Sequence, residues 1–216
     1  MEYNDSIFKR RAGHDNYDGS NATTTVTIVK DSTNLMAEEV TATYNLNKDL
    51  VISLTDSQGR PLNGVSVSVN INGNKAYAID KNGQIKINVA KLVPKTYTAK
   101  IKFNGSSKYE ASSASVKVTV KKAKAKIDAK KKTFKKSVKT KKYTITLKTN
   151  TNKAMKKAKV TLKIKGKTYK ATTNAKGKAV FKIKKLTKKG TFKAKVKFAG
   201  NTYYNAVTKT VKIKIK

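Results

Sequence analysis

The sequence contains no cysteine and no tryptophan, only two prolines, a single histidine, and only 12 acidic residues among 216. Without cysteine, a disulfide framework, a thiolate metal site and a cysteine nucleophile are all excluded. The lone histidine, His14, has no partner with which to build a catalytic triad or a metal site. There is also no long apolar run and no basic-then-apolar start. We therefore expect neither a membrane span nor an export signal in this sequence.

The few carboxylates do not form a recognisable catalytic or metal-binding pattern. Glu38 and Glu39 are adjacent, and adjacent residues of a strand point to opposite faces, so we do not expect an acid–base pair there. Asp49, Asp56 and Asp80 lie at predicted turns or strand starts, where aspartate commonly caps its own backbone. A calcium loop would need several closely spaced aspartates. We therefore expect no enzymatic activity, no cofactor and no bound metal.

The positive charge is concentrated in the second half of the chain. Residues 1–120 hold 15 basic and 11 acidic residues, a net charge of +4. Residues 121–216 hold 35 lysines and one acid, Asp128, a net charge of +34, and all three arginines lie in the first half. The second half therefore attracts anions through ammonium groups alone, which lack the planar fork with which arginine reads phosphates and base edges.

One segment of the sequence occurs three times. AGHDNYDGSNATTTVTIVK at residues 12–30 returns as NGSSKYEASSASVKVTVKK at 104–122 and as AGNTYYNAVTKTVKIKIK at 199–216. Each copy has a glycine, a tyrosine four residues later and then an alternating segment. The pairs are Gly13 and Tyr17, Gly105 and Tyr109, and Gly200 and Tyr204.

The spacing of 92 and then 95 residues between copies is the size of a domain. We predict two full repeats, a near-neutral one at 32–121 and a strongly lysine-rich one at 122–216. Residues 1–31 are predicted to hold the last strand or strands of a preceding, truncated repeat together with an irregular amino terminus.

Within each repeat, apolar residues recur at every second position. Val65, Val67 and Val69, for example, alternate with Ser66 and Ser68, which is the pattern of a half-buried strand. Glycine-containing turns separate such segments, and no helical period is present. Roughly seven short strands per repeat are typical of the immunoglobulin architecture. The sequence therefore predicts an all-β fold of tandem immunoglobulin-like antiparallel β-sandwich domains.

A family resemblance is carried by GRPLNGVSVSVNINGNKAYAIDKNGQIKI, by VPKTYTAKIKFNGSSKYEASSASVKVTV and by the final TFKAKVKFAGNTYYNAVTKTVKIKIK. These segments resemble the bacterial-type Ig-like repeats of archaeal adhesin-like surface proteins, especially those of methanogens. The resemblance implies a cell-surface, extracellular location and neighbouring Ig-like repeats as partners in a longer protein. It also implies that Met1 begins a fragment of such a protein or is a mis-assigned start. Fold alone does not assign a function, because such repeats are scaffolds.

Several smaller features admit two interpretations. The recurring Tyr17, Tyr109 and Tyr204 could form a platform for sugars, but a tyrosine corner, with each hydroxyl bonded to nearby backbone, is favoured. Asn21 and Asn104 occupy Asn-x-Ser/Thr sequons, which are acceptors for N-glycosylation if the chain is exported. A lysine–asparagine cross-link, known in some surface Ig-like repeats, would need a buried acid, and the last repeat offers only Asp128. His14 is expected to be a solvated loop residue.

The lysines of the last repeat take outward positions next to inward apolar residues. Lysine on exposed strands blocks pairing with other chains, yet the near-neutral repeat meets that need with far fewer charges. We therefore interpret the surplus as a contact surface for polyanions. The candidate contacts are Lys163, Lys165, Lys182, Lys184, Lys193, Lys195, Lys197, Lys212 and Lys214.

Three functions remain open from the sequence. The favoured one is a non-enzymatic cell-surface stalk or adhesin, whose last domain associates electrostatically with an anionic cell-wall or surface polysaccharide. The alternatives are a non-specific nucleic-acid binder and a purely structural spacer whose lysine excess is compositional. Missing arginines and inward aromatic residues disfavour nucleic-acid recognition. Non-specific polyanion binding in vitro is expected in every case.

Overall fold

The computed structural model describes residues 5–6 and 23–216, and each regular element in them is a β-strand. The alternation seen in the sequence is the cause. Along β18 (Gly190–Phe198), Ala194, Val196 and Phe198 are buried while the lysines between them are exposed. The all-β fold class is therefore confirmed. A search of the described part for a helix long and apolar enough to cross a membrane finds none.

Internal contacts divide the chain into two compact units. Unit 1 comprises Met1–Met36, Ile52–Ile85 and Lys100–Ala114, and unit 2 comprises Ala37–Val51, Lys86–Ala99 and Ser115–Lys216. Unit 2 therefore contains the whole lysine-rich repeat. The boundaries of the sequence repeats, at residues 31–32 and 121–122, stay a prediction.

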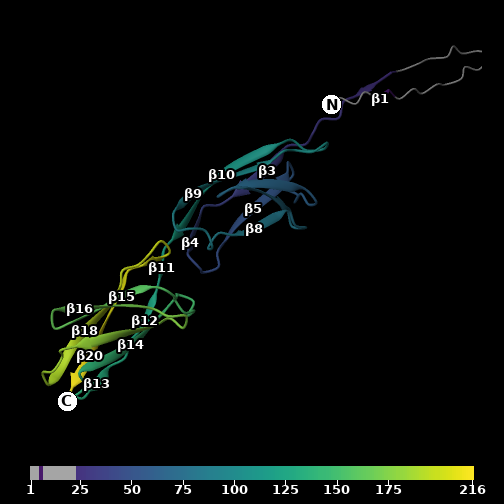
Figure 1. Cartoon of the computed structure of the whole chain (residues 1–216). Coiled ribbons are helices and arrows are strands. Elements are labelled where there is room, and N and C mark those ends of the chain that lie inside the picture. Colours follow the sequence, from purple (N-terminus) through teal and green to yellow (C-terminus); the bar gives the residue numbers. More distant parts are fainter. Residues whose placement is uncertain (1–4, 7–22) are drawn as a thin grey trace, which may run out of the picture. The chain divides into compact units, whose positions relative to one another are not determined.

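Within unit 2, the lysine-rich repeat is a sandwich of two sheets (Figure 1). The three-stranded sheet has the order β12 (Lys126–Asp128), β14 (Thr140–Lys148) and β17 (Lys178–Lys184). The five-stranded sheet has the order β13 (Lys132–Phe134), β20 (Val207–Ile215), β18, β15 (Lys159–Ile164) and β16 (Lys167–Thr172). A short parallel pair joins β11 (Ala123–Lys124) to β19 (Tyr204–Asn205). Leu147 and Phe181 from the first sheet and Leu162, Val196 and Ile213 from the second are fully buried in one core.

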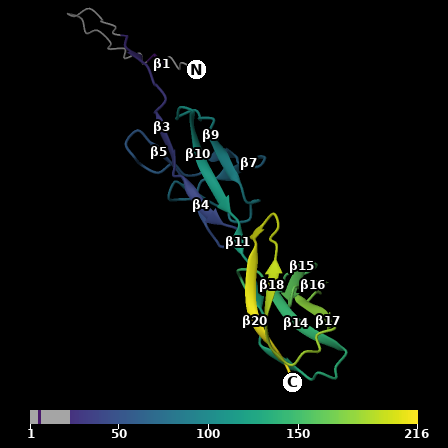
Figure 2. The same cartoon turned by 90° about the vertical axis from the view of Figure 1, so that its left-hand side faces the viewer.

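This strand order is that of an immunoglobulin-type sandwich, with the first strand split between the two sheets. Two features go beyond the prediction. First, β13 pairs with β20 in parallel, which an alternating sequence cannot indicate because it carries no information on strand direction. Second, β16 brings the number of sandwich strands to eight, one more than predicted. Only Tyr169 and Ala171 of its sequence KTYKAT are half-buried, so its alternation is a weak signal for a strand. In Figure 2, β18 and β20 lie side by side, as their antiparallel register requires.

The first repeat has the same strand order. One sheet is β3 (Thr33–Ala37), β5 (Asp49–Asp56) and β8 (Gln84–Asn88). The other is β4 (Val40–Thr43), β10 (Ser112–Lys121), β9 (Thr96–Phe103), β6 (Ser66–Asn70) and β7 (Asn74–Ala78). Here too the edge strand β4 runs parallel to β10. The tandem Ig-like sandwich is therefore present in both sequence repeats.

A further strand pair in unit 1 precedes the first repeat. Strand β1 (Asp5–Ser6) pairs with β2 (Thr25–Val26), and Asp5 is opposite Val26. In the last repeat, Phe192 pairs with Ile213. These two residues have the same sequence positions relative to Gly200 as Asp5 and Val26 have relative to Gly13. The backbone of this pair thus has the register of β18 and β20. The motif residues Gly13 and Tyr17, together with His14 and Asn21, lie outside the described residues.

Candidate functional site: the lysine-rich surface

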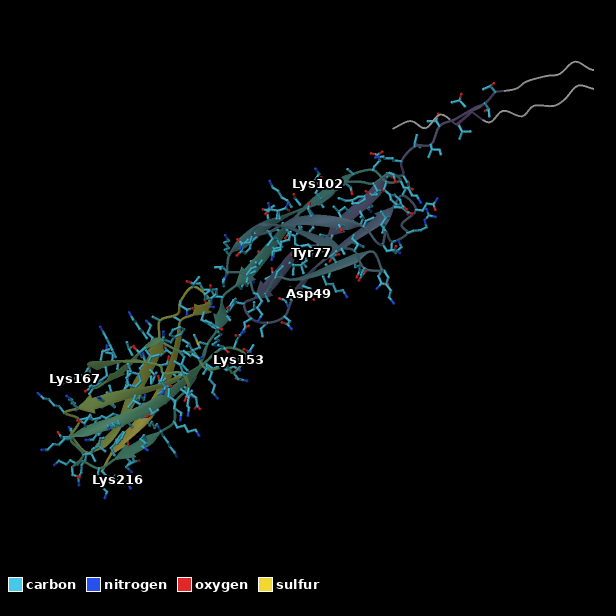
Figure 3. The ribbon with its side chains drawn as sticks, turned by 45° about the vertical axis from the view of Figure 1, so that its right-hand side comes forward. Asp49, Tyr77, Lys102, Lys153, Lys167 and Lys216 are labelled. Atoms are coloured by element: carbon cyan, nitrogen blue, oxygen red, sulfur yellow. The ribbon has the colours of Figure 1, made fainter. Side chains whose placement is uncertain are left out.

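The nine candidate lysines are all exposed, and the structure divides them among three places. Lys182 and Lys184 lie on β17 of the three-stranded sheet, and Lys165 lies in the turn between β15 and β16. The remaining six occupy outward positions of the five-stranded sheet, and they are Lys163, Lys193, Lys195, Lys197, Lys212 and Lys214. Figure 3 shows side chains of this repeat projecting outward, and the labelled Lys153, Lys167 and Lys216 are exposed.

Most lysines on the five-stranded sheet lie opposite a threonine. Two Lys–Lys pairs occur, Lys163 with Lys195 and Lys193 with Lys212. The other outward pairs on β15, β16, β18 and β20 alternate the two residue types: Lys159–Thr172, Lys163–Thr168, Thr161–Lys170, Thr161–Lys197, Thr191–Lys214, Lys195–Thr210 and Lys197–Thr208. Because like charges directly opposite each other are unfavourable, this Lys–Thr alternation keeps most ammonium groups of the sheet out of directly opposed pairs.

Lys165 differs from the other candidates. The antiparallel register joins Ile164 to Lys167, so Lys165 and Gly166 form a two-residue turn, and both have positive φ angles of 46° and 74°. The Lys165 Nζ lies 5.2 Å from the centroid of the Phe192 ring, within range of a cation–π contact. The expectation that Lys165 takes an outward strand position is therefore wrong, because β15 ends at Ile164.

The structure adds two lysines that the sequence analysis did not single out. Lys159 and Lys170 lie on the same outer face, and with Lys197 they line a hollow of about 610 Å³ over β15, β16 and β18. Thr161 and Thr172 also line this hollow, together with the apolar residues Val160, Ala171 and Ala199. The signal for Lys159 was available, because it is two residues from Thr161 and four from Lys163 on one strand.

The matched sheet of the first repeat shows which lysines the fold does not require. Ser68 pairs with Lys102 in the first repeat as Thr161 pairs with Lys197 in the last, so the strand registers match the two sheets residue by residue. In that alignment three lysines are shared, at 100/195, 102/197 and 117/212. Four others are uncharged in the first repeat, where the matched pairs are Ser66/Lys159, Asn70/Lys163, Thr98/Lys193 and Thr119/Lys214.

An acid beside one shared lysine is also lost. In the first repeat, Glu39 Oε2 lies 3.0 Å from Lys117 Nζ. The parallel register of β4 with β10, and of β13 with β20, places Lys131 at the position of Glu39, next to Lys212. A neutralising pair in one repeat is thus a pair of like charges in the other.

Asp56 and Asp80 have the capping role that the sequence predicted for the turn aspartates of the first repeat, whereas Asp49 is the first residue of β5. Asp56 Oδ1 accepts N–H hydrogen bonds from Gln58 and Arg60, and Asp56 Oδ2 lies 2.6 Å from Arg60 Nε. Burial acts to raise the pKa of the Asp56 carboxyl, but these hydrogen bonds and the Arg60 charge outweigh it, so the pKa lies below its usual value. Asp80 Oδ1 caps Asn82 and Gln84 in the same way.

The Gly-to-Tyr motif is a tight capped turn. Asn201 Oδ1 accepts the N–H groups of Tyr203 and Tyr204, and the Asn201 N–H donates to Tyr204 O at 2.9 Å. Gly200 has φ 86°, and an added Cβ would lie 2.8 Å from Tyr204 O. The equivalent Gly105, with φ 80°, would place a Cβ 2.9 Å from Tyr109 O. Glycine is therefore required by both the backbone conformation and the close approach of the carbonyl.

The tyrosine-corner expectation does not describe the hydroxyl contacts. Among the described residues, the phenols that donate to backbone are those of Tyr97, to Val93 O, and Tyr143, to Lys130 O, each at 2.7 Å, and that of Tyr169, to Lys184 O at 3.0 Å. Tyr204 is only 7% exposed, and its ring packs edge-on against Tyr44 with centroids 5.7 Å apart. Burial and the neighbouring Tyr44 raise the pKa of Tyr204. A ring so enclosed offers no open face for a sugar.

Other sequence candidates do not form a reactive site. Asp128 is exposed on β12, so it does not supply the buried acid that a lysine–asparagine cross-link needs. Burial, with the nearby Asp128 charge, raises the pKa of Tyr143 to about 12. Asn104 is exposed beside the Gly105 turn. Among the described residues, no group of three or more His, Cys, Asp or Glu side chains is close enough to hold a metal ion.

No protein-family model and no curated protein sequence matches the chain. Similar solved structures include invasin, a bacterial integrin-binding protein, at 16% identity and TM-score 0.49, covering 87% of this chain and 40% of that chain. They also include a multi-domain fragment of titin at 13% identity and TM-score 0.47, covering 87% and 66%. A third is a bacterial ice-binding adhesin at 16% identity and TM-score 0.37, covering 92% and 71%. At these values the likeness carries no argument about function, and the fold assignment rests on the strand order.

Proposed function

We propose that this chain is a non-enzymatic, extracellular repeat protein of the adhesin-like stalk type, comparable to those on archaeal cells. Its repeats, residues 32–121 and 122–216, act as spacers next to further Ig-like repeats. The last repeat associates electrostatically with an anionic polysaccharide of the cell wall or cell surface.

The observation that carries the proposal is the five-stranded sheet of the lysine-rich repeat. The outward strand positions of this sheet hold lysine and threonine. Five of its outward lysines match uncharged residues of the first repeat, and three match lysines. The only acid of this repeat, Asp128, is on the other sheet. A surface with one sign of charge raises the local concentration of an oppositely charged polymer.

A nucleic acid fits this surface less well than a polysaccharide. The outward residues of β15, β16, β18 and β20 that alternate across the sheet include no aromatic ring on which a base could stack. The half-buried Tyr169 is turned away, because its hydroxyl donates to Lys184 O at 3.0 Å. The repeat also contains no arginine, the residue that forms bidentate contacts with phosphates.

The proposal is tested by comparing binding of the full chain to purified wall polymer and to DNA at about 0.15 M salt, together with fractionation of host cells. We expect the chain in the wall fraction, with release by 1 M salt, and tighter binding to wall polymer than to DNA. A nucleoid-bound cytoplasmic pool would support the nucleic-acid alternative. A wall-bound chain that 1 M salt does not release, or no binding to either polymer, would favour a spacer whose lysines are compositional.

A further inference from the structure

We infer that the hollow over β15, β16 and β18 is a subsite that holds one anionic sugar unit of a linear polysaccharide. This inference rests on the proposed function and deepens it, because it assigns the polymer to one face and one place on that face.

The hollow combines three cations with hydroxyl groups. Thr161 on β15 lies between Lys170 on β16 and Lys197 on β18, so the register creates a row of ammonium, hydroxyl and ammonium groups. The adjacent row pairs Lys159 with Thr172. Neighbouring strands are about 4.8 Å apart, so the stems of the two outer lysines in the first row begin about 9.6 Å apart. Side chains on this spacing can surround a unit that lies over the central strand.

The chemistry of the lining suits an acidic sugar. Lysine ammonium groups attract a carboxylate or a phosphate as point charges and make no distinction of shape between them. Threonine hydroxyls both donate and accept hydrogen bonds, as sugar hydroxyls do. The volume of about 610 Å³ is within the range of small-ligand sites. A polymer that carries an anion on each sugar would satisfy both kinds of group at once.

The first repeat shows that the site is not a by-product of the fold. At the places of Lys159 and Lys170 it has Ser66 and Ala76, while Lys102 corresponds to Lys197. Two of the three cations are therefore absent from a sheet of the same strand order. A second hollow of the last repeat, beside Tyr143, is a weaker candidate because Asp128 lines it.

The sister repeat also supplies variants that should preserve the fold. The double substitution K159S/K170A installs the residues of the first repeat in the hollow. The control K176N/K178Q does the same at the start of β17, because Lys176 and Lys178 correspond to Asn82 and Gln84 and are not among the candidate contacts. Both variants remove two charges from the full chain, but the control leaves the hollow intact. Circular dichroism and thermal melting verify folding of each.

Binding is measured by calorimetry with an oligogalacturonate of about ten units at several salt concentrations. We expect K159S/K170A to weaken binding roughly 5- to 20-fold, since each exposed ion contact contributes modestly. The slope of log Kd against log salt should fall by about 1–2, one step for each lost contact. The control should change the affinity less than about twofold and leave the slope as it was.

Equal losses in the two variants would overturn the assignment to the hollow and leave polymer association standing. No effect of K159S/K170A would do the same. Failure of the unmodified chain to bind at about 0.15 M salt would contradict the proposed function itself. Linear polyphosphate serves as a probe without sugar, and an equal loss of affinity for it in K159S/K170A would overturn the sugar part of the inference.

Discussion

Matched turns are capped by carboxylates in the first repeat and by uncharged side chains in the last repeat. Asp80 Oδ1 accepts the N–H groups two and four residues later, and in the last repeat Asn174 Oδ1 accepts those of Lys176 and Lys178. Likewise, the turn that Asp56 caps in the first repeat is capped by Thr149 Oγ1, which accepts the N–H of Lys153. The carboxylate charge is therefore not needed to close either turn. Acids could be lost from the last repeat without loss of its turns.

Asp56 nevertheless contributes stability through its pairing with Arg60. Its folded pKa is below its usual value, so this contribution is present above an ordinary aspartate pKa of about 3.9 and is lost as pH falls through the folded value. We expect D56N to keep the cap and to melt at a lower temperature than the unmodified chain at pH 7. In acid, the two melting temperatures should become equal. Thermal melts at several pH values measure this.

D80N is the matched control, because Asp80 caps its turn with the same two hydrogen bonds but has no ion pair among the described residues. Its melting temperature should change little. Parallel pH profiles of D56N and the unmodified chain would contradict the role assigned to the Asp56–Arg60 pair.

At the scale of strands, the segment that begins with β2 has the apolar alternation of a core strand, but its apolar side chains are exposed. Val26 and Ile28 are 46% and 77% exposed. Counted from the motif glycine, they correspond to Val118 and Val120 of the first repeat, which are 0% and 2% exposed. The same alternation thus gives buried side chains on a long strand in one copy and exposed side chains in and after the two-residue β2 in the other. Exposed apolar strands favour pairing with other chains.

We expect V26S/I28S to leave the melting temperature nearly unchanged and to reduce self-association. The same change at the matched buried sites, V118S/V120S, should destabilise the fold by about 2–5 kcal/mol, because it removes packed apolar groups and buries hydroxyls. Thermal unfolding and sedimentation velocity measure the two effects. A large loss of stability in V26S/I28S would mean that these side chains are packed.

Alternation predicted where the strands are and which residues face the core, because burial on one face imposes a period of two. It predicted neither the partner of a strand nor its direction, so the division of nine lysines among two sheets and a turn had to come from the structure. Lys141 shows the limit within one strand. It shares the inward parity of Tyr143, is 1% exposed, and its Nζ donates to Val138 O at 2.6 Å. Because neighbouring positions are also lysines, the sequence pattern does not show that this one faces inward.

At the scale of the molecule, charge separates the two repeats more than fold does. Two ammonium groups about 7 Å apart in water repel each other by about 0.6 kcal/mol before screening. The Lys–Thr alternation on the five-stranded sheet spreads this repulsion but does not remove it. Salt largely screens exposed charges that lie farther apart than the Debye length, which is about 10 Å at 0.1 M and about 3 Å at 1 M. The lysine-rich repeat should therefore be more stable at higher ionic strength.

We expect K131E to raise the melting temperature at low salt, because it recreates beside Lys212 the pair that Glu39 makes with Lys117. An exposed pair contributes about 0.2–1 kcal/mol, which corresponds to roughly 1–6 °C for a domain of this size. The difference should disappear in 0.5 M salt. The reciprocal variant E39K should lower the low-salt melting temperature of the full chain. Calorimetry measures the melting temperatures of both variants at low salt and in 0.5 M salt. A K131E effect that persists in high salt would contradict an electrostatic origin.

The parallel edge strand has a mechanical consequence. Strand β20 is bonded to β18 on one side and, through Lys132–Phe134, to β13 on the other. A pull along β20 loads these hydrogen bonds together in shear, whereas a pull across the sheet would open them one after another. The strand must also slide by two residues, about 6.8 Å, before its apolar side chains face the core again. We therefore expect the repeat to resist tension along this axis more than across the sheet, and β4 on β10 gives the first repeat the same geometry.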